Sequence, residues 1–186
     1  MKKNWICFFS QTGSEIVNVS NRLGRDPDLI ITNRDNLKGI NNILLEKYID
    51  KIVFIPTKPS IEDYERITKK YSEYFNNCFI TLHGFLRIIP DLFCRHFNIY
   101  NLHPGLITKY PELKGFNPQE KAFNLKLKTS GSVIHKVIAE VDSGEILDSV
   151  EISIENLSLD TIYNSLHNAS TDLWVRFLGK LLDDNN

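Results

Sequence analysis

The chain has 186 residues, and its 22 basic and 23 acidic side chains leave a formal net charge of −1. This balance excludes a broadly basic nucleic-acid coat, and a content of 42% hydrophobic and 11% aromatic residues excludes a disordered chain. A chain of this length buries roughly 70% of its unfolded surface without needing disulfides or a structural metal, so we expect one globular domain over residues 1–186.

Short apolar runs alternate with segments of helical periodicity over the first hundred residues. The apolar runs are continuous, which indicates burial on both faces, as in a parallel sheet with helices on each side. The predicted strands cover residues 5–9, 29–32, 52–55, 78–82 and 98–102, and the predicted helices cover residues 14–23, 36–48, 60–75 and 88–97.

The pattern changes after residue 102. An irregular stretch over residues 104–118 precedes a predicted helix at 119–125, and two longer strands follow at 132–141 and 146–154. Because only four residues separate these two strands, we expect a tight antiparallel hairpin that extends the sheet. The apolar periodicity of residues 160–182 predicts an amphipathic C-terminal helix. The sequence therefore predicts an α/β fold with a mostly parallel sheet and a C-terminal antiparallel strand pair.

The cysteines and the N-terminal segment indicate an intracellular protein. Cys7, Cys78 and Cys94 are widely spaced and include no CxxC pair, so we expect reduced thiols. The apolar run at residues 5–9 is short and lacks a small-residue cleavage site, unlike a signal peptide. No stretch reaches the ~18 apolar residues of a membrane helix. We therefore expect a soluble, cytoplasmic protein.

The first candidate ligand site is the turn formed by Thr12, Gly13, Ser14 and Glu15. It connects the first strand to the first helix, at the sheet edge where open α/β folds bind ligands. Free N–H groups of Gly13 and Ser14 beside the positive helix end could hold an anion such as a phosphate, although Glu15 repels one. The alternative is that these residues only form the turn and cap the helix.

The second candidate combines Asn101 and His103 at the end of the fifth strand. Strand alternation puts both side chains on the same side, and Pro104 ends the hydrogen-bond ladder, so we expect them at an exposed strand end. An amide donor beside an imidazole meets the needs of acyl transfer, and Asp142 could favour the imidazolium form. A buried structural histidine and a simple turn aspartate remain the alternatives. The sequence has no spacing typical of a metal site and no P-loop, complete GxGxxG or GxSxG motif.

Taken together, these residues resemble the folate-dependent formyltransferase family, most closely its small phosphoribosylglycinamide formyltransferase branch. Five segments carry the resemblance in order and spacing: SQTGS at 10–14, ITNR at 31–34, GFLRII at 84–89, NLHPGLITKYP at 101–111, and GSVIH at 131–135 followed by VDSG at 141–144. The resemblance implies a Rossmann-like formyltransferase fold with 10-formyltetrahydrofolate as the formyl donor.

The resemblance also implies roles for particular residues. Asn101 and a protonated His103 would stabilise the tetrahedral intermediate, and Asp142 would hold the imidazolium and an ordered water that relays the proton. Thr12, Gly13, Ser14 and Glu15 would bind the acceptor. The pterin would lie in a slot whose binding residues are Leu86, Arg87, Ile88, Ile89, Ala139, Glu140 and Val141. No metal is implied.

The acceptor is expected to be the primary amine of a small, phosphorylated molecule such as glycinamide ribonucleotide. Residues 112–118 lack the usual Gly-Leu-x-Thr segment, and Glu15 replaces an expected asparagine at the phosphate turn. Residues 115–118 resemble the corresponding loop of nucleotide-sugar N-formyltransferases, so an amino-sugar nucleotide is the alternative acceptor. Two other classes stay open, namely a 10-formyltetrahydrofolate hydrolase and a non-catalytic folate- or nucleotide-binding module. We expect the chain length to leave no room for a regulatory or tRNA-binding domain, and therefore expect no nucleic-acid partner. We also expect a monomer or homodimer without a membrane partner.

Overall fold

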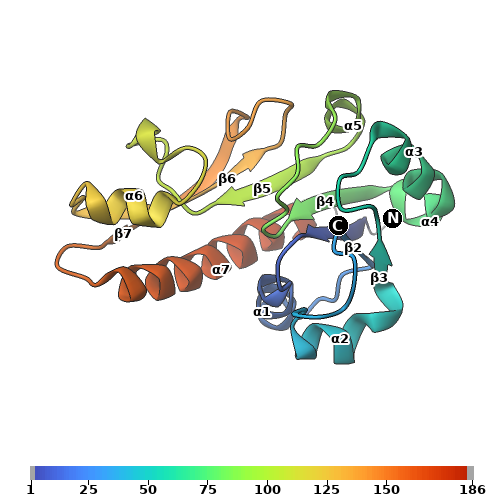
Figure 1. Cartoon of the computed structure of the whole chain (residues 1–186), viewed down its shortest axis with the longest axis horizontal. Coiled ribbons are helices and arrows are strands. Elements are labelled where there is room, and N and C mark those ends of the chain that lie inside the picture. Colours follow the sequence, from blue (N-terminus) through green and yellow to red (C-terminus); the bar gives the residue numbers. More distant parts are fainter. Residues whose placement is uncertain (1–2, 184–186) are drawn as a thin grey trace.

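The structure, a computed structural model, describes residues 3–183. Within these residues a seven-stranded sheet has the order β3-β2-β1-β4-β5-β6-β7 (Figure 1). Strands β1 to β5 pair in parallel, whereas β6 pairs antiparallel with both β5 and β7. The predicted α/β fold with a C-terminal antiparallel pair is therefore confirmed. The strands are β1 Asn4–Phe9, β2 Leu29–Thr32, β3 Ile52–Phe54, β4 Cys78–Leu82, β5 Ile99–His103, β6 Thr129–Lys136 and β7 Ile146–Ser153.

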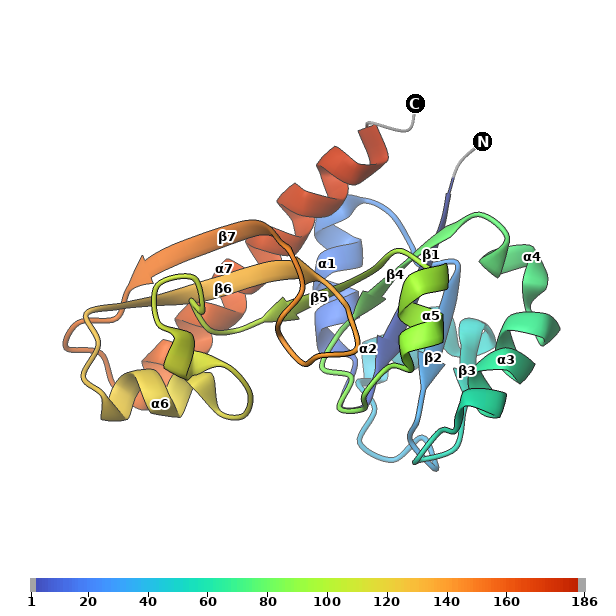
Figure 2. The same ribbon diagram turned by 90° about the horizontal axis from the view of Figure 1, so that it is seen from above.

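Helices cover both faces of this sheet. Figures 1 and 2 show α1, α2 and the long α7 on one face, and α3, α4 and α5 on the other. Helix α6 lies beside the antiparallel end of the sheet and contacts α7. The helices are α1 Ser14–Leu23, α2 Asn42–Tyr48, α3 Ile61–Lys70, α4 Ser72–Phe75, α5 Asp91–His96, α6 Pro118–Asn124 and α7 Leu159–Asp183, with 3₁₀ turns at η1 Ile49–Lys51 and η2 Pro111–Leu113.

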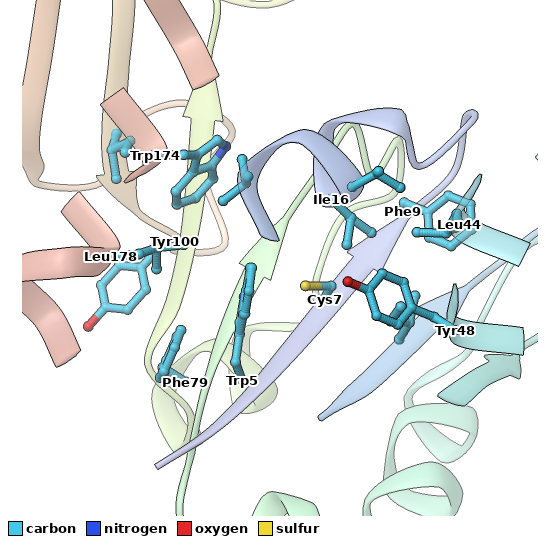
Figure 3. Close-up of a cluster of buried hydrophobic side chains, with 14 of the residues drawn as sticks. Trp5, Cys7, Phe9, Ile16, Leu44, Tyr48, Phe79, Tyr100, Trp174 and Leu178 are labelled. Carbon is cyan, nitrogen blue, oxygen red and sulfur yellow. The ribbon is translucent and has the colours of Figure 1, made fainter. Parts of the chain in front are cut away.

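Strand β1 shows why its apolar run is continuous. Cys7 and Phe9 pack into the cluster under α1, α2 and α7, where Figure 3 shows them beside Tyr48 and Leu44 of α2. Phe8, which alternates with them, packs instead into the cluster formed by α3, α4 and α5. Because successive side chains of a strand point to opposite faces, a strand buried on both faces must be apolar at every position.

Three predicted helices differ from those observed, each for a local reason. Helix α2 begins at Asn42 rather than residue 36, because Gly39 adopts a left-handed conformation (φ +77°) and the Asn41 side chain caps the helix. The helix predicted at 60–75 is divided at Tyr71 (φ −117°, ψ 36°) into α3 and α4. Helix α5 starts only after Pro90, consistent with the bias of residues before a proline against helical conformation.

The predicted tight hairpin between β6 and β7 is wrong. Strand β6 ends at Lys136, and residues 137–145 leave the sheet as a loop (orange in Figure 2) before β7 begins. The Lys136 N–H donates to the Glu145 carbonyl at 2.9 Å, which closes the loop at its base. Val137 then donates to the Ile99 carbonyl and packs into the cluster under α5. The sequence has no turn signal that predicts this tertiary contact. Because Val137 draws the chain out of the sheet, Asp142 lies in the loop and not in a tight turn between the strands.

Two further expectations concern the thiols and membrane helices. Cys7, Cys78 and Cys94 are free thiols, as predicted. Burial raises the pKa of Cys78 to about 12 and also raises the pKa of Cys94. Within residues 3–183, no helix has the length and apolar character needed to cross a bilayer.

Candidate active site

Strand β5 presents Asn101 and His103 on the same face, as strand alternation predicts, while Leu102 packs against the cluster under α7. The expected exposed position of His103 is wrong, because the segment after β5 folds back over it and leaves the residue 5% exposed. The Nε2 atom of His103 lies 2.8 Å from the Leu113 carbonyl oxygen in η2. Because a carbonyl only accepts hydrogen bonds, Nε2 carries a hydrogen in this arrangement.

Asp142 reaches this histidine from the loop between β6 and β7. The residue is buried and its backbone is left-handed (φ +49°), a conformation that aspartate tolerates better than most residues. Its Oδ2 atom lies 3.3 Å from Nδ1 of His103 and accepts the Gly115 N–H at 3.1 Å. Its Oδ1 atom lies 3.5 Å from Nε2 of His135. The structure thus brings together the three residues predicted to be catalytic.

The net effect of burial and of the neighbouring groups is to lower the pKa values of both Asp142 and His103. Burial raises the pKa of Asp142, but His135, His103 and the Gly115 N–H outweigh it and hold the pKa below its usual value. Burial also lowers the pKa of His103, more than the neighbouring Asp142 carboxylate raises it. The resting site therefore pairs a carboxylate with a neutral imidazole at neutral pH. The predicted role of a protonated His103 concerns the tetrahedral intermediate and stays a prediction.

His135 belongs to this site although it was not among the predicted site residues. It lies on β6 directly opposite Asn101 in the β5–β6 register, with its Nε2 atom 3.2 Å from the Asn101 amide nitrogen. Its Nδ1 atom lies 3.1 Å from the Lys136 carbonyl, which requires the hydrogen on Nδ1 and leaves Nε2 to accept from Asn101. The histidine of the GSVIH segment was visible in the sequence, but only the strand register connects it to Asn101.

The residues predicted to bind the pterin lie on two neighbouring segments. Residues 86–89 follow β4, and Ala139, Glu140 and Val141 are exposed in the β6–β7 loop. Val137 at the start of this loop packs in the same buried cluster as Ile89, which brings the two segments together. Leu86 and Val141 expose more than half of their surface, whereas the Ile89 side chain belongs to the core and cannot line a slot.

A polar network holds the segment after β4 in place. The Ser10 hydroxyl accepts the Leu86 N–H at 2.8 Å and donates to Oδ1 of Asn33 at 2.6 Å. Asn33 and Arg87 in turn both donate to the Thr57 carbonyl, at 2.9 Å and 2.7 Å. Residues from the ends of β1, β2 and β4 are therefore tied together at this edge of the sheet.

The turn before α1 lines a cleft of about 260 Å³ between this turn, the end of β5, α6 and α7. Gly13 is required there, because its φ is +72° and a Cβ atom would lie 2.7 Å from Leu44. The predicted free N–H of Ser14 is instead bonded to the Thr12 hydroxyl at 3.3 Å. The Glu15 carboxylate turns to His83 Nδ1 at 2.7 Å. The turn is therefore less suited to an anion than the sequence suggested.

A larger cavity of about 720 Å³ lies between α3, α4 and α5. Its lining includes Tyr64, Phe93 and Cys78, and none of the predicted site residues. Because catalysis requires several polar groups directed at one point, size alone does not make this cavity the active site. The arrangement of Asn101, His103 and Asp142 therefore remains the candidate reactive position.

Comparisons with known proteins give consistent results. The family model described as formyl transferase matches residues 3–178. The phosphoribosylglycinamide formyltransferase of Dictyostelium discoideum is 40% identical over 107 residues, which cover 52% of this chain and 50% of the relative. The methionyl-tRNA formyltransferase of Macrococcus caseolyticus is 28% identical over 167 residues, which cover 85% of this chain and 52% of the relative. The chain therefore spans about half the length of these curated relatives.

A solved structure extends the comparison to the fold. The crystal structure of phosphoribosylglycinamide formyltransferase from Anaplasma phagocytophilum superimposes with a TM-score of 0.84 at 22% identity. The alignment covers 99% of this chain and 89% of that protein. At this level of identity the similarity establishes a shared fold.

Proposed function

The chain belongs to the formyl transferase family, and we propose that it transfers a formyl group from 10-formyltetrahydrofolate to the primary amine of a small acceptor. The observation that carries the proposal is the buried contact of Asp142 with His103, beside the amide of Asn101. These groups can move a proton and stabilise an oxyanion, which are the two requirements of formyl transfer.

His103 is positioned to move the proton. With its Nε2 hydrogen donated to Leu113, the neutral ring has its lone pair on Nδ1. As the acceptor nitrogen forms a bond to the formyl carbon, Nδ1 takes the proton that this nitrogen loses. The carbon–nitrogen bond to the folate then breaks, and His103 returns the proton to the departing folate nitrogen. Asp142, 3.3 Å from Nδ1, stabilises the imidazolium between these two steps.

Asn101 is positioned to stabilise the oxyanion of the tetrahedral intermediate. One hydrogen of its amide points to Nε2 of His135, at a nitrogen-to-nitrogen distance of 3.2 Å. The amide nitrogen has a second hydrogen, which is available to the oxygen of the formyl group. His135 thereby fixes the direction of the donor without needing to touch the substrate.

The formyl donor of the family, 10-formyltetrahydrofolate, fits the surface beside these residues. Leu86, Ile88 and Val141 expose apolar side chains where the segment after β4 meets the β6–β7 loop. An apolar slot with backbone polar groups at its edge suits a flat pterin ring. We propose that the residues at 86–89 and 139–141 form this slot, with Ile89 acting through its backbone and its packing.

Two observations support a proposal for the acceptor, namely the names of similar proteins and the cleft beside α1. Relatives named phosphoribosylglycinamide formyltransferase make glycinamide ribonucleotide the first amine to test. The cleft that Thr12, Gly13, Ser14 and Glu15 help to line includes Leu102 and Pro104 at the end of β5, and we propose that the acceptor extends from it toward His103. We further propose that the sheet and its helices act as one catalytic domain.

An enzyme assay tests this function. The purified protein is incubated with 10-formyltetrahydrofolate and a panel of primary amines, and both tetrahydrofolate and the formylated amine are measured. We expect amine-dependent turnover that His103→Gln lowers by about 10²-fold or more. His96→Gln is the matched control, because His96 is exposed on α5.

Three other outcomes would contradict the proposal. Formate release without an amine would identify a hydrolase. Folate binding without turnover of any amine would identify a binding module. Unchanged turnover in His103→Gln would refute the assignment of the proton transfer to this residue.

A further inference from the structure

The cleft beside the end of β5 contains a carboxylate that is held in place from several sides. Leu102 and Pro104, which flank His103 in the chain, line this cleft, so a molecule bound there lies beside the end of β5. The side chains of Asn101, His103 and Asp142 are not part of its lining. Glu15 also lines the cleft, with a side chain that is 22% exposed. The residues that bond to the Glu15 carboxylate determine which of its oxygens a bound molecule can contact.

His83 is the first group that holds Glu15. Its side chain is fully buried, and its Nδ1 atom lies 2.7 Å from Oε2 of Glu15. Because a carboxylate only accepts hydrogen bonds, Nδ1 is the donor. The other ring nitrogen of His83 lies 2.9 Å from the Thr81 hydroxyl, which also accepts the Trp5 indole N–H at 2.8 Å. This buried chain of contacts fixes the histidine ring.

Trp174 is the second group that holds Glu15. Its indole N–H donates to the same Oε2 atom at 3.3 Å, and its ring lies 5.1 Å from that of His83. Figure 3 shows this tryptophan reaching from α7 toward α1, within the buried cluster. Three elements, α1, α7 and the end of β4, thus hold one oxygen of the carboxylate. Among the residues that the structure describes, no hydrogen bond engages the other oxygen, Oε1, which leaves it able to accept one from a ligand.

The remainder of the cleft offers little to an anion. Its lining includes no lysine or arginine side chain. The N–H of Ser14 at the start of α1 is already bonded to the Thr12 hydroxyl. The two histidines of the lining are already engaged, His83 by Glu15 at 2.7 Å and His167 by the Asn18 amide at 3.2 Å. The other groups are neutral and polar, such as the Gln119 amide and the Tyr163 hydroxyl. A phosphate would therefore meet the Glu15 carboxylate and neither a lysine nor an arginine, and like charges placed together oppose binding.

We propose that Glu15 makes the cleft select an acceptor that presents uncharged hydroxyl groups there, as a sugar does, and makes it reject a phosphate monoester. A hydroxyl donates to the free Oε1 atom, and the amide and hydroxyl groups of the lining bind the others. This inference rests on the proposed formyl transfer, and it makes Glu15 a specificity-determining residue of that reaction. It replaces the expectation of a phosphorylated acceptor at this position.

Two amines that differ only in the phosphate test the proposal. Glycinamide riboside and glycinamide ribonucleotide are compared by kcat/KM with saturating 10-formyltetrahydrofolate. We expect the riboside to be preferred by about tenfold or more, and Glu15→Gln to shift the ratio toward the ribonucleotide by about tenfold. Glutamine keeps an oxygen that can accept from His83 and Trp174, so this variant preserves the packing. Glu46→Gln, on the exposed side of α2, is the matched control and should not change the ratio.

A binding measurement makes the inference independent of turnover. Ribose 5-phosphate is titrated into the wild-type protein and into Glu15→Gln by calorimetry, and we expect the variant to bind about tenfold more tightly. Equal binding to both proteins, or a wild-type preference for the ribonucleotide, would overturn the role of Glu15. Formyl transfer with an unchanged ratio in Glu15→Gln would refute this inference alone. Absence of transfer to any amine would refute the proposed function, while the titration would still decide the inference.

Discussion

Replacing Asp142 by asparagine isolates the charge of this residue from its shape. The amide oxygen of asparagine can still accept the Gly115 N–H, which Asp142 accepts at 3.1 Å. Asparagine also tolerates the left-handed backbone at this position, where φ is +49°. The substitution therefore removes the negative charge beside His103 and keeps the local structure.

The separation of the two groups gives the expected size of the effect. Unit charges at the observed 3.3 Å between Oδ2 of Asp142 and Nδ1 of His103 attract by about 5 kcal/mol at an effective dielectric constant of ~20, and by about 1 kcal/mol in bulk water. An intermediate value of about 3 kcal/mol suits a site that opens to substrate, and it corresponds to about 10²-fold in rate. Because the attraction exists only while His103 carries the proton, the loss should appear in kcat.

The assay measures kcat at saturating 10-formyltetrahydrofolate and amine, together with unfolding in urea. We expect Asp142→Asn to lower kcat about 10²-fold and to change the free energy of unfolding by less than about 1 kcal/mol. Asp148→Asn is the control, because Asp148 on β7 pairs with Arg176 at 2.7 Å outside the site. It should leave kcat unchanged. A kcat for Asp142→Asn within about threefold of wild type would refute the imidazolium as the proton carrier.

Three other predictions follow from the site and its supports. Since burial lowers the pKa of His103 and the neutral ring is the base, kcat should rise with pH through a midpoint below ~6.5, and a midpoint above that value would contradict a neutral resting state. Ser10→Ala removes the acceptor of the Leu86 N–H, so KM for 10-formyltetrahydrofolate should rise about fivefold with kcat unchanged; an unchanged KM would separate this network from folate binding. Gly144→Ala should lower the free energy of unfolding by about 2–3 kcal/mol, because its Cβ atom would lie 1.7 Å from the last carbonyl oxygen of β6. In Gly179→Ala the added Cβ meets no atom within 4 Å beyond its chain neighbours and its own helix backbone, so this variant should not destabilise the protein. Equal urea midpoints for the two variants would contradict the steric argument.

The sequence predicted the elements whose boundaries depend on local chemistry. Helix α1 and strands β2 and β4 have the predicted bounds, because apolar runs or periodicity end there at turn residues. The predicted boundaries are wrong where a tertiary contact or a special backbone conformation sets the end of an element. The start of α2 depends on the left-handed Gly39, and the end of β6 depends on Val137 leaving for the core under α5. Neither feature changes the hydrophobic pattern in a way that periodicity can detect.

The site was predictable only where strand geometry governs it. Alternation along β5 was sufficient to place Asn101 and His103 on one face. The contact of His135 with Asn101 depends on the antiparallel register of β6, and the Glu15 contacts combine three separate elements. Spacing along the chain carries no information about such contacts. The burial of His103, and with it the direction of its pKa shift, likewise required the folded segment at η2.

The segment that lacks the expected Gly-Leu-x-Thr motif makes its contacts with the proposed catalytic residues through its backbone. Within residues 112–118, the Leu113 carbonyl accepts from His103 and the Gly115 N–H donates to Asp142. Phe116 between them and α6 is 83% exposed, so its side chain is free to vary without disturbing either bond. Because every residue but proline supplies the same carbonyl and N–H groups, substitutions here can change acceptor recognition while the proton-transfer geometry is retained. A proline at position 115 is the exception, since it would remove the donor to Asp142 and alter the proposed catalytic pair itself.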